Sequence, residues 1–390
     1  MSTNNENNEK VQQILNNVIE VGFEGVPIPN WEKTDPFNEL QAQYNIPGVG
    51  IVVIQDFKVE WTRFFGFRSK FTEQNCRQEL DTNTLFEAAS ATKPVVTVAL
   101  LHLVEKGELD LDADVNTYFK EWKIPENDFT KDEKVTLRRL LTHTAGVNPP
   151  DSMFSYEEGS TPTLLNVLNG ESPAINDPVK IEFIPGSKHK YSNLGYVIIQ
   201  KIMEDVTGKS LNQILNEIIF TPLQMNPGAT TVEYQLPLEL AMNTIVHHDQ
   251  DGNPAGKGLH PSAFAQGNLS INPFYFAKFV VEIMESYQGK SNKILSQEMT
   301  RKMLESYHSF EPNEMMGITD QALGFFLMKN EKNTFFLLPG SNAPGANCML
   351  LGSPLTGQGA VIMTNGAMGE LLNLRLTYTL AKAYDWNFGV

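Results

Sequence analysis

Ser90 and Lys93 are the side chains whose types and spacing most directly suggest chemistry in this chain. They stand three residues apart, where an apolar stretch at 84–89 runs into a predicted helix. Positions i and i+3 share one helix face, so the lysine amine can reach the serine hydroxyl. A serine needs a neighbouring base at neutral pH, and a lysine serves as that base only when its pKa falls below about 10.4. The pair therefore predicts a serine nucleophile that forms a covalent acyl intermediate.

A second Ser-x-x-Lys sequence, Ser187 to Lys190, follows the turn expected at Pro185-Gly186. No helix face aligns this second pair, so we expect a solvated basic loop there. For Ser90 the corresponding alternative is a helix cap with a solvated lysine three residues on. Further motifs are needed to choose between the two interpretations.

Tyr191 and Asn193 form the only Tyr-x-Asn sequence in the chain. A phenol near a lysine can carry a proton between nucleophile and leaving group, and an asparagine amide can hold a substrate carbonyl and orient the lysine. The alternative is a tyrosine packed at a loop edge before the apolar helix predicted at 195–206. With Ser90 and Lys93, the tyrosine completes a candidate catalytic set.

The order of these motifs resembles that of the serine β-lactamase-like family, which contains class C β-lactamases, D-Ala-D-Ala peptidases, esterases, D-amino-acid peptidases and acyltransferases. Other segments similar to that family's lie at 140–146, 206–225 and 266–279. The resemblance spans residues 36 to 385, roughly. It implies an α+β fold, an α/β sandwich in which an antiparallel sheet is flanked by helices and a mainly helical domain is inserted.

The third motif of that family, a Lys-Thr-Gly or His-x-Gly on an inner strand, is altered here. The similar run at 338–345 places Pro339 at the basic position. Proline has no charge and no donor, so it cannot hold the carboxylate that penicillins and D-Ala-D-Ala peptides present. A shift of one residue would place Leu338 or Gly340 there, and neither is basic.

We nevertheless expect Gly340, Ser341 and Asn342 to bind substrate. The resemblance implies an oxyanion hole built from backbone N–H groups, those of Ser90 and Asn342. Gly340 would let substrate approach the backbone closely. The alternative for this run is a glycine- and proline-rich turn with no role at the site.

Composition is that of a large enzyme-like chain. It has 390 residues, 41% of them apolar, which is enough for a sizeable core. A net charge of −16 argues against nucleic acid or an anionic membrane as partner. Cys76 and Cys348 are too few for a disulfide framework, and the seven histidines show no zinc-site spacing. We expect His143 to be structural, and we expect no metal or organic cofactor.

The chain opens with a polar, asparagine-rich stretch that has neither a basic start nor an apolar core of the kind seen in secretory signals. No run of about twenty apolar residues appears, so no membrane span is expected. The predicted location is therefore cytoplasmic.

The predicted elements place the site in two discontinuous parts. We expect a disordered tail at 1–8, an amphipathic helix at 11–21, a hairpin of strands 48–55 and 59–66, a helix from Ser90 to Glu105, strands at 322–328, 334–338, 346–351 and 359–364, and a closing helix at 369–383. The predicted divisions are an N-terminal tail and helix at 1–35, a sheet domain at 36–111 and 285–390, and a helical domain at 112–284.

The function predicted from these residues is a serine hydrolase that forms an acyl-enzyme on a small ester or amide, carboxylesterase-like or acyl-transferring. One alternative is a β-lactamase or a D-amino-acid or D-Ala-D-Ala peptidase, which would need a cation from Lys188, Lys190 or Lys257. A second alternative is a non-catalytic binding or assembly protein on the same fold, suggested by Pro339.

Overall fold

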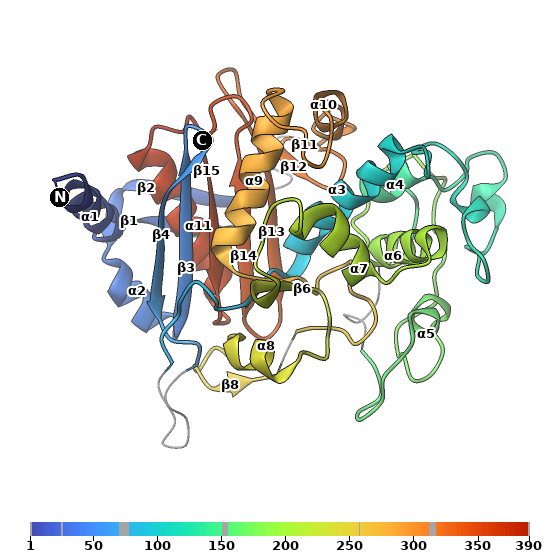
Figure 1. Ribbon diagram of the computed structural model, residues 1–390, viewed down its shortest axis with the longest axis horizontal. Coiled ribbons are helices and arrows are strands. Elements are labelled where there is room, and N and C mark those ends of the chain that lie inside the picture. Colours follow the sequence, from blue (N-terminus) through green and yellow to red (C-terminus); the bar gives the residue numbers. More distant parts are fainter. Residues whose placement is uncertain are drawn as a thin grey trace.

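A computed structural model describes residues 2–24, 26–69, 78–149, 155–256, 258–311 and 317–388 (Figure 1). These residues form a mixed α+β structure. An eight-stranded antiparallel sheet has helices on both faces, and further helices gather at one end of the sheet (Figure 1). The predicted fold class is confirmed.

The main sheet is assembled from both halves of the chain. Its strands, in spatial order, are β10 (His308–Ser309), β11 (Asp320–Gln321), β12 (Phe326–Lys329), β13 (Thr334–Asn342), β14 (Ala346–Gly352), β15 (Gly359–Thr364), β3 (Gly48–Gln55) and β4 (Lys58–Gly66). The late strand β15 pairs with the early strand β3, so the two halves of the chain meet between the sixth and seventh strands of the sheet.

The short strands and the helices complete the architecture. The smaller sheets contain β1 (Val18–Glu24) with β2 (Val26–Asp35), β5 (Phe86–Glu87) with β9 (Ser270–Ile271) and β6 (Thr230–Thr231), and β7 (His247–His248) with β8 (Pro254–Ala255). The helices are α1 (Ser2–Leu15), α2 (Phe37–Gln43), α3 (Thr92–Glu105), α4 (Leu137–Leu141), α5 (Leu164–Asn169), α6 (Asn193–Thr207), α7 (Leu211–Leu215), α8 (Leu238–Asn243), α9 (Pro273–Tyr287), α10 (Gln297–Met303) and α11 (Gly369–Ala383).

Strand β3 shows how the sheet joins two apolar cores. Val52 and Ile54 belong to the core that also contains side chains of α3, α6 and α9. The alternate residues Val49, Ile51 and Val53 belong to the core beneath α11. A strand buried on both faces reads as a continuous apolar run, as residues 49–54 do.

The predicted hairpin is confirmed, and its turn has a clear cause. Asp56 and Phe57 both have positive φ, 49° and 63°, which suits a two-residue turn between tightly paired strands. The strand predicted at 322–328 is confirmed only in its second half, because β12 begins at Phe326 and ends at Lys329. Strand β13 extends four residues past its predicted end and includes Pro339, a residue that usually signals the end of a strand.

The N-terminal prediction is also wrong in two respects. Helix α1 begins at Ser2, so residues 2–8 are helical rather than a disordered tail. The same helix ends at Leu15, and Val18 to Val21 lie in β1 instead of continuing it. Val18, Ile19 and Val21 are β-branched and pair with β2, and the backbone N–H of Ile19 donates to Thr379 Oγ1 on α11 at 2.9 Å.

The helical part of the chain lies beside the sheet, where α4, α5 and α6 group together (Figure 1). Helix α9 was predicted to belong to this part, but it packs against β3, β4, β14 and β15. We therefore propose that the second boundary lies near residue 272, ahead of α9. No helix in the described ranges is long and apolar enough to span a membrane.

Candidate active site

The structure brings the three predicted catalytic side chains together. Ser90 lies in the 3-10 turn Ala89–Ala91 that leads into α3. Lys93 Nζ is 3.0 Å from Ser90 Oγ, and the Tyr191 hydroxyl is 3.2 Å from the same oxygen. Tyr191 reaches this position from just before α6, 101 residues later in the chain.

The turn that carries Ser90 is strained and tightly held. Ala89 has φ +48°, a left-handed conformation that a non-glycine residue adopts at a cost of about 1–3 kcal/mol. The Ala88 N–H donates to the Leu269 carbonyl at 2.7 Å, which fixes the start of the turn. Strain of this kind is typical of functional sites, where the surrounding structure imposes it.

Lys93 is fully buried, and its surroundings favour the neutral amine. Burial lowers the pKa of Lys93 well below its ordinary value. Its Nζ donates to the backbone carbonyl of Gln266 at 2.6 Å. An uncharged acceptor does not restore the charge, so the amine can act as a base toward Ser90.

Tyr191 keeps its proton at neutral pH, because burial raises the pKa of its phenol to about 12. Its ring packs against the imidazole of His143, with centroids 4.2 Å apart. His143 Nδ1 accepts the backbone N–H of Ser192 at 3.2 Å. The histidine that was expected to be structural thus supports the tyrosine directly.

Asn193 begins α6 at the site, but it is not seen to orient the lysine. Its Oδ1 is buried and has no hydrogen-bond partner among the described residues. The Gln266 carbonyl holds the Lys93 amine instead. Sequence reasoning missed Gln266 because a backbone carbonyl carries no residue-type signal.

Gly340 lies against the nucleophile turn. A Cβ at this position would lie 2.2 Å from the Ala88 carbonyl oxygen and 3.0 Å from the Ser90 nitrogen. The close approach that the glycine permits is therefore that of the protein's own backbone. Asn342, two residues on, is buried and donates from Nδ2 to the Gly267 carbonyl at 3.2 Å.

Pro339 does not face Ser90, which corrects the predicted reading of the third motif. Side chains alternate along a strand, so the residues next to Gly340 face the opposite side of the sheet. Pro339 lines an apolar cavity with Leu374 and Tyr378 of α11, and Ser341 Oγ donates to Asn347 Oδ1 at 2.9 Å.

Leu338 is the residue of β13 that shares the face of Gly340. It lies two positions earlier on the strand and is buried. Leu338 itself belongs to the core beneath α11, against which Tyr191 also packs, and its cross-strand partner Leu350 belongs to the core that contains α3. The position that faces the nucleophile before Gly340 is therefore occupied by an aliphatic side chain.

The backbone of β13 presents an open edge near the site. The Leu327 carbonyl accepts the Thr319 N–H at 2.8 Å, so Leu327 directs its polar groups toward β11. The backbone N–H and C=O of its register partner Phe336 must then point toward β14, and those of Leu337 must point toward β12. By the same alternation, the N–H of Ser341 points to the edge that β12 leaves unpaired.

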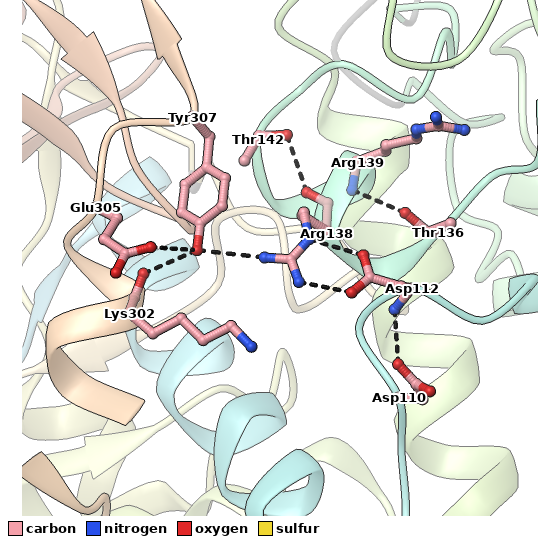
Figure 2. A network of polar contacts seen from close by, with 9 residues as sticks. All are labelled: Asp110, Asp112, Thr136, Arg138, Arg139, Thr142, Lys302, Glu305 and Tyr307. Atoms are coloured by element: carbon pink, nitrogen blue, oxygen red, sulfur yellow. Dashed lines mark hydrogen bonds and ion pairs between the residues drawn. The ribbon is translucent and has the colours of Figure 1, made fainter. Parts of the chain in front are cut away.

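A polar network surrounds Arg138 on α4 and includes Thr142, the residue before His143 (Figure 2). Arg138 on α4 donates to both carboxylate oxygens of Asp112 at 2.7 Å and to the Tyr307 hydroxyl at 3.2 Å. Thr142, next to the histidine, donates to the Arg138 carbonyl at 2.9 Å. The network ties α4 to the segment that follows α10.

The lysines considered as carboxylate partners have other contacts. Lys190 pairs with Glu182 at 2.6 Å, and Lys188 Nζ lies 4.7 Å from the ring centroid of Phe183. Lys257 lies outside the described residues. In the described part of the chain, no group of three or more His, Cys, Asp or Glu side chains is arranged to hold a metal ion.

Comparison with known proteins identifies the family. The family described as Beta-lactamase matches residues 35–384, nearly the whole chain. This chain belongs to the beta-lactamase family. Among curated relatives, it is 25% identical over 238 residues to an N-acetylmuramyl-L-alanine amidase of Bacillus subtilis (strain 168) and 26% identical over 252 residues to a putative D-alanyl-D-alanine carboxypeptidase of Escherichia coli (strain K12). These alignments cover 60% and 64% of this chain, and 48% and 53% of the relatives, so the chain matches about half of each relative's length.

Solved structures show the same fold. The octameric penicillin-binding protein homologue from Pyrococcus abyssi superimposes with a TM-score of 0.71 at 24% identity, over 89% of this chain and 76% of that one. A D-amino acid amidase from Ochrobactrum anthropi SV3 complexed with L-phenylalanine gives a TM-score of 0.71 at 20% identity, over 97% and 99%. The family is one of serine hydrolases.

Proposed function

We propose that this protein is a serine hydrolase that forms an acyl-enzyme at Ser90 on an uncharged ester or amide, with carboxylesterase-like or acyl-transferring activity. The observation that supports it most is the position of a fully buried lysine amine and of the phenol of the partly buried Tyr191 within 3.2 Å of one serine oxygen. A solvated lysine beside a helix cap would be neither buried nor paired with a tyrosine on the same oxygen.

In the proposed mechanism, Lys93 is the base. The neutral amine keeps one N–H on the Gln266 carbonyl and directs its lone pair at the Ser90 hydroxyl. As the serine oxygen bonds to the substrate carbonyl carbon, its proton moves to Lys93. Tyr191 gives its phenolic proton to the leaving group as the scissile bond breaks, and it recovers a proton from the Lys93 ammonium. Water, or an alcohol or amine acceptor, then releases the acyl group by the reverse sequence.

The oxyanion hole is the second part of the proposal. The N–H of Ser90 supplies one donor, and the open edge of β13 supplies the other. The strand alternation favours Ser341 for this second donor in place of Asn342, whose N–H faces β14. Asn193, with its amide at the start of α6, remains the candidate that holds the acyl carbonyl.

The substrate class follows from Leu338. An aliphatic side chain on the nucleophile's face of β13 cannot hold a carboxylate, so we propose substrates without a charge beside the scissile bond. The relatives compared above, an amidase and a putative carboxypeptidase, favour an amide bond as a second candidate. A carboxypeptidase substrate would need a cation from elsewhere.

The proposal is tested with p-nitrophenyl esters, D-phenylalanine amide, a D-Ala-D-Ala peptide and a chromogenic cephalosporin. We expect the short esters to be hydrolysed fastest. We also expect a fluorophosphonate to attach one phosphonyl group to the wild type, seen as a single mass increment of that group, and none to Ser90→Ala. Labelling that persists in Ser90→Ala, for example at Ser187, would assign the nucleophile elsewhere. Turnover of the cephalosporin at the rate of the esters would refute the proposed substrate class.

A pair of lysine substitutions on β13 tests the corrected reading of the third motif. Leu338→Lys should raise activity on carboxylate-bearing esters by roughly tenfold to a hundredfold, since one charge-assisted hydrogen bond is worth about 1.5–3 kcal/mol. Pro339→Lys is the matched control, because its side chain faces α11 and should give no gain. A gain in activity on carboxylate-bearing esters in Pro339→Lys alone would mean that Pro339, and not Leu338, faces the site.

A further inference from the structure

A buried carboxylate and a buried imidazole meet beside the strand that leads to Ser90. Glu87 is the last residue of β5, three positions before the nucleophile. Its Oε2 lies 3.2 Å from Nε2 of His247 in β7, and the two side chains are 0% and 1% exposed. The proposed mechanism uses neither residue.

The contacts of His247 leave Glu87 as the neighbour of its second ring nitrogen. Its Nδ1 lies 3.2 Å from the Gly256 carbonyl, which can only accept a hydrogen bond. No described residue forms a hydrogen bond of normal geometry with Nε2 or with either oxygen of the Glu87 carboxylate. A buried carboxylate without a nearby partner is strongly unfavourable, so the close approach of Nε2 and Oε2 is the contact that offsets the burial of Glu87.

This buried pair links the nucleophile strand to a distant segment. Residues 243–247 run alongside β5, where the Leu85 N–H donates to the Asn243 carbonyl and the Ile245 N–H donates to the Leu85 carbonyl, both at 2.9 Å. The same segment continues to Gly258, where a Cβ would lie 2.6 Å from the Cβ of Asn342. The segment thus runs from the base of the Ser90 turn to the end of β13.

We infer that Glu87 and His247 are positioning residues, whose buried contact holds the Ser90 turn in register with residues 243–256 and the open end of β13. The effect on rate rests on the proposed function, whereas the pairing itself does not. Removal of either side chain leaves the other one buried without its contact. We expect the two segments to move apart as a result, which displaces the backbone near the proposed oxyanion donors.

Four variants test this inference: Glu87→Ala, His247→Ala, the double variant and Glu87→Gln. Each alanine variant should lower kcat and the fluorophosphonate labelling rate by about tenfold to a hundredfold with KM changed by less than about threefold, because a displacement near 1 Å has an effect of that size. The double variant should lose no more than the worse single variant, since the partners act as a unit. Glu87→Gln should stay within about threefold of wild type, because its amide N–H can donate to Nε2 while Nδ1 keeps its proton on Gly256.

Glu282→Ala is the matched control. Glu282 is a second buried carboxylate, on α9, and it is satisfied by Ser291 Oγ at 2.8 Å and by the Lys293 N–H at 3.1 Å. This control should lower the melting temperature without lowering kcat. An equal loss of kcat in Glu282→Ala, or a Glu87→Gln variant as impaired as Glu87→Ala, would overturn the inference.

A separate readout distinguishes this inference from the proposed function. If the wild type shows no Ser90-dependent labelling, the proposed function fails, and the thermal unfolding of the same four variants still tests the pair. Additive losses of stability in the double variant would then refute the coupling between Glu87 and His247.

Discussion

Gly340→Ala is the substitution for which the structure makes the sharpest prediction. The added Cβ would lie 2.2 Å from the Ala88 carbonyl oxygen, whereas ordinary contact begins at 3.4 Å. Strand β13 and the Ser90 turn must therefore separate by about 1 Å, because the atoms that the added methyl group meets belong to the backbone of the turn and cannot rotate away. A displacement of about 1 Å at a reacting group reduces the rate on the order of a hundredfold. Overpacking of this kind also lowers the free energy of unfolding by about 1–3 kcal/mol.

Hydrolysis of a p-nitrophenyl ester, fluorophosphonate labelling and thermal unfolding measure the two effects separately. Gly195→Ala is the matched control, since it adds the same methyl group to α6 beside the site. There the nearest atom would be 3.7 Å away, and an alanine in a helix interior is favoured over glycine by up to about 1 kcal/mol. We expect this control to keep its activity and its stability.

The result that refutes the reasoning is a Gly340→Ala protein with nearly wild-type kcat. It would mean that the turn and β13 are not held in the contact described here, and that an oxyanion donor on this strand is not needed. Equal losses in Gly340→Ala and Gly195→Ala would instead attribute the effect to general destabilisation.

Three further predictions concern the lysine, the tyrosine and the polar network of Figure 2. Lys93→Met should abolish ester hydrolysis yet raise the free energy of unfolding at pH 7 by about 0.5–2 kcal/mol. Burial lowers the pKa of Lys93 in the folded wild type, so the wild type takes up a proton when it unfolds at pH 7. The wild type therefore becomes more stable as pH rises toward about 10.4, and the stability advantage of Lys93→Met should be smaller at pH 9 than at pH 7 in denaturation curves. Lys93→Ala and Tyr191→Phe should each slow acylation by about a hundredfold to ten-thousandfold. The double variant should lose far less rate than the product of the two single losses, because the residues act as a unit. Fully multiplicative losses in stopped-flow assays would show that the two residues do not share a proton path. Asp112→Ala should lower the free energy of unfolding by no more than about 1 kcal/mol, because the carboxylate is largely exposed. Arg138→Ala should lower it further, because it also removes the hydrogen bond to Tyr307, and urea titration of the two variants checks this order.

The sequence alone was sufficient to predict that Ser90 and Lys93 lie together and to predict much of the sheet. Ser90 and Lys93 could be paired because i and i+3 positions at a helix start are neighbours whatever surrounds them. Strands β3 and β15 and helix α11 have the predicted bounds, since each is a long apolar or amphipathic run with clear ends. Tyr191 is distant in sequence, and only the resemblance to a known family linked it to Ser90.

Sequence patterns failed where a local rule met a tertiary contact. The apolar spacing at 11–21 fits a helix, but pairing with β2 and the bond from Ile19 to Thr379 turn its second half into a strand. Pro339 argues for the end of a strand, yet its missing N–H falls on an edge that has no partner strand, so β13 continues to Asn342.

The faces of β13 and the partners of buried groups were decided only by the tertiary structure. Whether Leu338 or Pro339 faces Ser90 depends on the register of the strand, and a shift of one residue exchanges the two. The Gln266 carbonyl beside Lys93 is a backbone group that any residue would supply, so its position leaves no trace in residue types. The sequence therefore determined which groups can react, and packing across distant segments determined which neighbours set their protonation and aim.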